Sequence, residues 1–245
     1  MPTRHLLARA QGVWVELAGA PAAFGPAGGA RVVVSPASGL CPPGWTGLVV
    51  LGGSALATAP DAPAAEAVRR ALSALPPEAA ATGAIRDVLP VADVLGPAAL
   101  SYLAEDRFRS VPGAATADRL PGRHPAVRAL EQAAGDDDTA EAALDDITSP
   151  AFVVRARGEV VAAAGYRGWP GRTAHLSVLT APAARGRGLA RTAASAAVGH
   201  ALAAGLLPQW RARPPASRRV AAALGFEELG AQLSFVLTVG EAAPR

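Results

Sequence analysis

The sequence contains no lysine and no asparagine, and it has a single cysteine, Cys41. Without lysine, the chain cannot form a Walker A phosphate-binding loop, nor can it use lysine Schiff-base chemistry. One cysteine excludes an internal disulfide framework and any zinc site built from several cysteines. All 23 basic residues are arginine. This composition is typical of GC-rich coding, so the number of arginines alone indicates no ligand.

Long apolar runs are also missing. The richest stretch without an acid or base, residues 192–209, is rich in alanine and includes a histidine, so it is too weakly apolar for a membrane helix. Residues 1–20 carry Arg4, Arg9 and Glu16 between short apolar pieces, a pattern unlike a secretory signal. With 245 residues, 51% of them hydrophobic, the chain can build one large or two ordinary globular domains. We expect a cytoplasmic protein with no membrane partner.

Charge is distributed unevenly along the chain. Residues 1–150 hold 11 arginines and 16 acids, whereas residues 151–245 hold 12 arginines and only 4 acids. Codon bias can set the number of arginines, but it does not decide where the acids lie. The asymmetry favours an anionic ligand for the C-terminal part, against the alternative that the arginines only solvate its surface.

The N-terminal part alternates β-rich runs with Gly- and Pro-rich turns. We predict three strands there, at 12–17, 31–35 and 47–51. Apolar residues then recur at three- and four-residue steps over 62–75 after Asp61, which predicts an amphipathic helix with an aspartate cap. A stretch of small and polar residues follows, and we place a domain boundary near residue 112.

The C-terminal part alternates helical and strand patterns. Helical periodicity over 125–144 is interrupted at Gly135, which predicts two short helices. A hairpin is expected at 151–155 and 159–166, turning at Arg157-Gly158. The remaining elements are predicted as a strand at 173–180, a helix at 189–206, a strand at 207–213, a helix at 217–224 ended by Gly225, and a strand at 232–238.

The most informative residues lie where a strand meets a helix. Residues 180–190 read TAPAARGRGLA, so two glycines and two arginines precede the helix. Successive backbone N–H groups in such a loop converge at a helix N-terminus, which suits a diphosphate, and the guanidinium groups add charge-assisted hydrogen bonds. The dinucleotide-binding signature is incomplete, because Arg191 stands where its third glycine belongs.

The segment Arg185-Gly-Arg-Gly188-Leu-Ala190 resembles the R/Q-x-x-G-x-G/A signature of the GNAT superfamily of acyl-CoA-dependent N-acyltransferases. Pro182 precedes the arginine as in this family, and Gly225-Phe226 resembles the Gly-Phe that ends its last short helix. The resemblance implies a GNAT domain at 113–240, followed by a tail at 241–245 and preceded by an N-terminal α/β region at 1–112. The implied fold class is α/β (α+β), a mixed, mostly antiparallel sheet flanked by helices.

The resemblance further implies that acetyl-CoA or another acyl-CoA is held where strands 173–180 and 207–213 separate, with no metal. An acetyl group would pass directly to a primary amine of a small molecule or protein. The implied cofactor-binding residues are Val178, Leu179, Thr180, Arg185, Gly186, Arg187, Gly188, Leu189 and Ala190.

The usual catalytic groups of the family are absent. The tyrosine that protonates the departing thiolate in many relatives is replaced by Ala221, and an asparagine common nearer the helix start is replaced by Pro214. Three side chains remain as candidates. Ser217 can hydrogen-bond the sulfur or cap its helix, Tyr166 offers a phenol at a strand end, and His175 can accept a proton or act as a structural histidine.

The acceptor end is less well defined. Glu141, Asp145 and Asp146 can attract a cationic amine or form a solvated helix face. A water molecule can serve in place of a dedicated base. Trp169 and Trp210 are interpreted as packing residues.

Three functions remain open from the sequence. An N-acetyltransferase is preferred, a non-catalytic acyl-CoA-binding or regulatory module is the alternative, and a nucleic-acid contact at 185–191 is the weakest because no aromatic residues are interleaved with the arginines. We therefore expect no nucleic-acid partner. Residues 1–112 can lengthen the acceptor site, mediate a homodimer, or form a decayed second copy of the same fold.

Overall fold

The computed structural model describes residues 4–112, 114 and 117–238. Contacts divide the chain into two compact units, one made of residues 1–100 and 229–245 and the other of residues 101–228. The units therefore do not coincide with the predicted limits at 112/113 and 240, and the predicted tail lies outside the described residues. No helix in the described part is long and apolar enough to cross a membrane.

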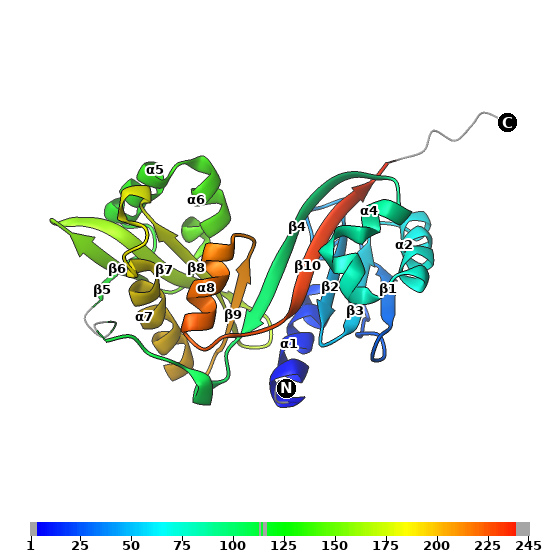
Figure 1. The fold of residues 1–245 in the computed structure, drawn as a ribbon, viewed down its shortest axis with the longest axis horizontal. Helices are drawn as coiled ribbons and strands as arrows, with labels where there is room; N and C mark the ends of the chain where they lie inside the picture. Colours follow the sequence, from blue (N-terminus) through cyan, green and yellow to red (C-terminus); the bar gives the residue numbers. More distant parts are fainter. Residues whose placement is uncertain (1–3, 113, 115–116, 239–245) are drawn as a thin grey trace. The chain divides into compact units, whose positions relative to one another are not determined.

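The first unit is built on a sheet with the order β1-β3-β2-β10-β4 (Figure 1). The strands are β1 (Ala30–Val34), β2 (Thr46–Leu51), β3 (Ser54–Ala59), β4 (Val91–Tyr102) and β10 (Glu227–Leu237), and the helices are α1 (Arg4–Leu17), α2 (Ala62–Ala74), α3 (Pro77–Ala79) and α4 (Ile85–Val88). Helix α2 begins as predicted, because Asp61 accepts a hydrogen bond from the Ala64 N–H at 2.8 Å.

The strand predicted at 12–17 is wrong, since these residues belong to α1. The buried residues of this helix are Leu6, Ala10, Val13 and Trp14, a helical spacing that becomes visible only when residues 4–11 are read together with 12–17. The final strand predicted at 232–238 is present within β10, but these residues belong to the first unit and not to the C-terminal one. Strand β10 pairs antiparallel with β2, and a side chain at Gly230 would meet the Val50 carbonyl oxygen at 1.8 Å, so glycine permits this close pairing.

The second unit has the sheet order β9-β8-β7-β6-β5, antiparallel except between β8 and β9. The strands are β5 (Asp118–Leu120), β6 (Ala151–Ala156), β7 (Glu159–Trp169), β8 (Thr173–Thr180) and β9 (Leu207–Ala212). The helices are α5 (Pro125–Ala134), α6 (Asp136–Ala142), α7 (Leu189–Ala203) and α8 (Pro215–Ala223). The predicted interruption at Gly135 and hairpin turn at Arg157-Gly158 are confirmed.

Helices cover both faces of this second sheet (Figure 1). The alanine-rich face of α7 packs with Ala174 and Leu176 of β8 and with Trp210 of β9. On the opposite face, α5 and the residues after α6 pack against Leu179 and Val153. The expected mixed, mostly antiparallel sheet flanked by helices is confirmed.

Candidate functional site

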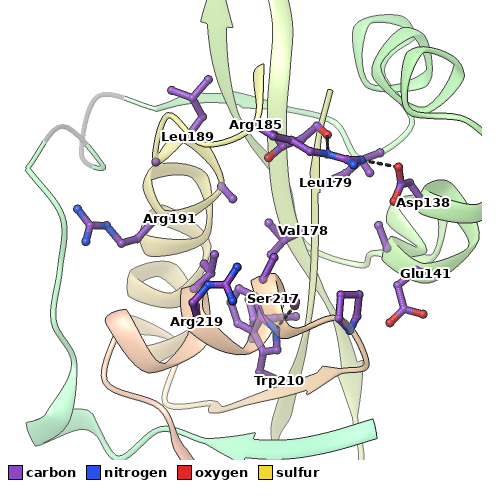
Figure 2. A pocket seen from close by; sticks show the side chains of 18 of the residues that line it. Asp138, Glu141, Val178, Leu179, Arg185, Leu189, Arg191, Trp210, Ser217 and Arg219 are labelled. Atoms are coloured by element: carbon purple, nitrogen blue, oxygen red, sulfur yellow. Dashed lines mark hydrogen bonds and ion pairs between the residues drawn. The ribbon is translucent and has the colours of Figure 1, made fainter. Parts of the chain in front are cut away.

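The site is formed where β8 and β9 separate. Their parallel pairing runs from Thr173–Leu207 to His175–Gln209, while β8 continues to Thr180 and β9 to Ala212. A cavity of about 660 Å³ opens at this point, and Leu176 and Trp210, which follow the last pair, line it. Its other walls come from the loop after β8, the start of α7, α6 and α8 (Figure 2).

The loop that connects β8 to α7 presents backbone donors to this cavity. Gly186 and Gly188 have φ angles of 76° and 77°, which glycine adopts without the cost of a side chain. Gly188 is the residue that precedes α7, and no side chain caps it. The N–H groups of Leu189, Ala190 and Arg191 therefore have no acceptor within the helix, and they carry the positive end of its dipole. This arrangement suits an anion.

Most of the predicted cofactor-binding residues line the cavity. These are Val178, Leu179, Thr180, Arg185, Gly186, Gly188, Leu189 and Ala190, whereas Arg187 is exposed and does not line it. The Thr180 Oγ1 atom is buried and has no hydrogen-bond partner in the described part of the chain. A buried hydroxyl without a partner costs free energy, so this atom favours a polar ligand at the same wall.

Arg185 is ion-paired with Asp138 of α6, and its Nε–H donates to the Thr180 carbonyl at 3.4 Å (Figure 2). Sequence reasoning did not select Asp138, although it lies three residues before Glu141 on the same helix face. Glu141 also lines the cavity and accepts from Arg213 Nε at 2.7 Å. The two acids on the cavity wall are thus both engaged by arginines.

The other acidic candidates lie elsewhere. Asp146 is ion-paired with Arg167 at 3.0 Å, and neither Asp145 nor Asp146 lines the cavity. The structure therefore brings only Glu141, of the three acids proposed for the acceptor end, to the cavity wall.

Ser217 lies at the cavity in the first turn of α8. The residue that precedes this helix is Pro214, and no side chain caps it, so the interpretation of Ser217 as a helix cap is wrong. Its Oγ instead accepts a hydrogen bond from Trp210 Nε1–H at 2.9 Å (Figure 2). Because a hydroxyl both accepts and donates, the Ser217 proton stays available to a ligand.

Tyr166 is placed away from the cavity. Its hydroxyl is hydrogen-bonded to His200 Nδ1 at 2.8 Å, and its ring is buried in the core beside α7. Burial raises the pKa of this phenol.

His175 also lies outside the cavity lining. Its Nδ1 is hydrogen-bonded to Gln209 Oε1, and its ring stacks on Trp169 with centroids 4.0 Å apart. Burial lowers the pKa of His175 to about 4, so the ring is neutral near pH 7. These contacts agree with the structural role considered for this histidine.

Comparisons with known proteins agree with the motif. A family model described as GNAT acetyltransferase matches residues 150–231 and confirms the predicted resemblance over that segment. No curated protein matches the sequence.

Several solved structures are similar to parts of the chain. A protein of Novosphingobium aromaticivorans assigned to the GNAT family is 25% identical, with a TM-score of 0.46 over 59% of this chain and 65% of its own. A GCN5-related N-acetyltransferase of Kribbella flavida is 20% identical, with a TM-score of 0.46 over 62% of both chains. A Salmonella typhimurium protein solved with acetyl-CoA is 21% identical, with a TM-score of 0.34 over 61% of this chain and 99% of its own. The match thus spans less than two thirds of the length of the first two proteins.

Proposed function

We propose that residues 101–228 transfer an acetyl group from acetyl-CoA to a primary amine of a small molecule or protein. The observation that carries this proposal is the 185–190 loop on the wall of a cavity between two separating strands, where the first amides of α7 have no acceptor within the helix. The GNAT acetyltransferase family model covers the same loop.

The donor fits this cavity in two respects. The amides at the start of α7 and the guanidinium of Arg185 supply donors for a diphosphate. Beyond His175, the backbone groups of β8 that point toward β9 have no strand partner there, so they can pair with the amides of the pantetheine arm. The unpartnered Thr180 hydroxyl lies on the same wall.

The transfer needs an unprotonated amine and a stabilised leaving thiolate. The ammonium first loses a proton to water, and the amine nitrogen then attacks the thioester carbonyl. A carbon–nitrogen bond forms, the carbon–sulfur bond breaks, and the second nitrogen proton leaves while the thiolate takes up a proton from solvent. In this proposal the Ser217 hydroxyl donates a hydrogen bond to the sulfur, a role supported by its position on the cavity wall and by the Trp210 N–H that holds its oxygen.

Direct binding and turnover test this proposal. Acetyl-CoA should bind the wild-type chain in calorimetry, and thiol release should follow with at least one member of a broad amine panel. The Gly188→Trp variant should lose binding, because the side chain enters open space at the cavity wall. Gly158→Trp is the matched control, since Gly158 also has a positive φ of 86° and open surroundings but lies in the β6–β7 turn.

The outcomes separate the three functions. Binding without thiol release across the panel would favour the non-catalytic module. Salt-dependent RNA binding that survives Gly188→Trp, together with no acetyl-CoA binding, would favour the nucleic-acid contact.

A further inference from the structure

Two adjacent arginines on α8 have different surroundings. Arg218 donates to both carboxylate oxygens of Glu228, at 3.0 and 2.9 Å. Arg219 lines the cavity, and no ion pair within the described part of the chain includes it. Figure 2 shows its guanidinium directed toward Val178, in the space between α7 and α8. Arg219 is thus a cation that faces the cavity without a carboxylate partner.

The cavity wall carries an excess of positive charge. Four arginines line it, namely Arg185, Arg191, Arg211 and Arg219. The two acids of the wall do not offset Arg219, because Asp138 is paired with Arg185 and Glu141 with Arg213. Within a concave surface, this balance favours a ligand that carries more than one anionic group.

Coenzyme A has two separate anionic groups, a diphosphate and a phosphate monoester on the 3′ oxygen of its ribose. The donors of the 185–190 loop are grouped at one place, at the start of α7, and they account for the diphosphate. The monoester lies beyond the ribose and needs a donor on another element. A guanidinium matches two phosphate oxygens with its paired N–H groups, whereas a neutral side chain cannot supply this charge.

We infer that Arg219 binds the 3′-phosphate of the donor and that it makes the site select coenzyme A over its 3′-dephospho form. This inference rests on the proposed function. Arg191 is another exposed arginine of the cavity lining, but Figure 2 shows its side chain directed away from the cavity.

Calorimetry with coenzyme A and 3′-dephospho-coenzyme A tests the assignment without any turnover. The wild-type chain should bind coenzyme A about tenfold more tightly, the effect expected of one charge-assisted contact with a phosphate at an exposed site. Arg219→Gln should bind both ligands equally, at the level of the dephospho form. Arg218→Gln is the matched control and should keep the tenfold preference, because Arg218 is held by Glu228. The preference should shrink as salt rises from 50 to 300 mM.

Each result decides the question. Equal binding of both ligands by the wild-type chain would overturn this inference and leave the proposed function standing. Loss of the preference in Arg191→Gln but not in Arg219→Gln would also overturn it. If the wild-type chain bound neither ligand, the inference and the proposed function would both fail. Circular dichroism of every variant separates loss of a contact from loss of the fold.

Discussion

Ser217→Ala tests whether the hydroxyl at the cavity acts on the leaving sulfur. The thioester sulfur is uncharged in the bound donor and becomes anionic as the carbon–sulfur bond breaks. A hydrogen bond to a charged group is worth about 1.5–3 kcal/mol, so its loss should lower kcat about 10- to 100-fold. The KM for acetyl-CoA should change little, because the contact gains its strength only in the transition state.

The same substitution has a structural cost that must be measured separately. Trp210 is 3% exposed, and its indole N–H loses its acceptor when the Ser217 oxygen is removed. An unsatisfied buried donor costs about 1–3 kcal/mol, and the adjoining cavity admits water, so we expect about 1 kcal/mol. Urea unfolding measures this cost, and thiol release measures the rate. Ser217→Thr retains the hydroxyl and should keep most of the activity.

A variant of Trp210 tests whether this residue acts only by positioning the Ser217 hydroxyl. Trp210→Phe removes the indole N–H but leaves the Ser217 hydroxyl free to rotate, so it should lower kcat less than Ser217→Ala does. In the double variant the two losses should not add, because Trp210 acts through Ser217. If Ser217→Ala destabilised the fold by the expected amount but left kcat within twofold of wild type, the role given to this hydroxyl would be refuted.

Two further predictions concern the stability of the fold. Gly225→Ala should lower the free energy of unfolding in urea by about 2–5 kcal/mol, because φ is 96° and the new Cβ would lie 2.0 Å from the Arg107 carbonyl oxygen. Gly158→Ala, where φ is 86° and the surroundings are open, should lower it by only about 1 kcal/mol. Equal losses in the two variants would contradict the packing argument. The pKa of His175 in the folded chain is about 4, below its ordinary value of 6.5. Between these pH values the unfolded chain therefore binds more protons than the folded chain. The free energy of unfolding should fall by about 2–3 kcal/mol as the pH drops from 6.5 to 4. His175→Phe keeps a ring against Trp169 and should lose this pH dependence, and an unchanged slope in that variant would show that another group is responsible.

Most elements of the second unit could be predicted because local residues mark their ends, although the short strand β5 was missed. Gly135 separates α5 from α6 with a φ of 88°, and Arg157-Gly158 turns the hairpin with positive φ at both positions. Pro182 follows the end of β8, and Gly225, with a φ of 96°, follows the end of α8. Signals of this kind lie within a few residues of the boundary that they set, so a single sequence contains them.

Pairing across long sequence distances could not be predicted in this way. Strand β10 has a clear strand pattern, but nothing near Gly230 indicates that its partner is β2. Strand β3 was missed because its alanine-rich sequence has few β-branched residues, although it follows β2 directly. The pairs Arg185–Asp138 and Trp210–Ser217 join residues from different elements, so only the fold brings them together.

The absence of the family's tyrosine does not by itself indicate that the chain lacks catalytic activity. Ala221, which occupies that position, is buried in the core with Phe226 and presents no polar group to the cavity. Ser217 lies four residues earlier, one helical turn away on the same side of α8, and does line the cavity. Because Trp210 fixes the orientation of its oxygen, this hydroxyl can stabilise a thiolate with a pKa near 8.5 without delivering a proton to it. A chain without the tyrosine therefore still has a polar donor at the cavity, so the substitution by alanine alone does not favour the non-catalytic module.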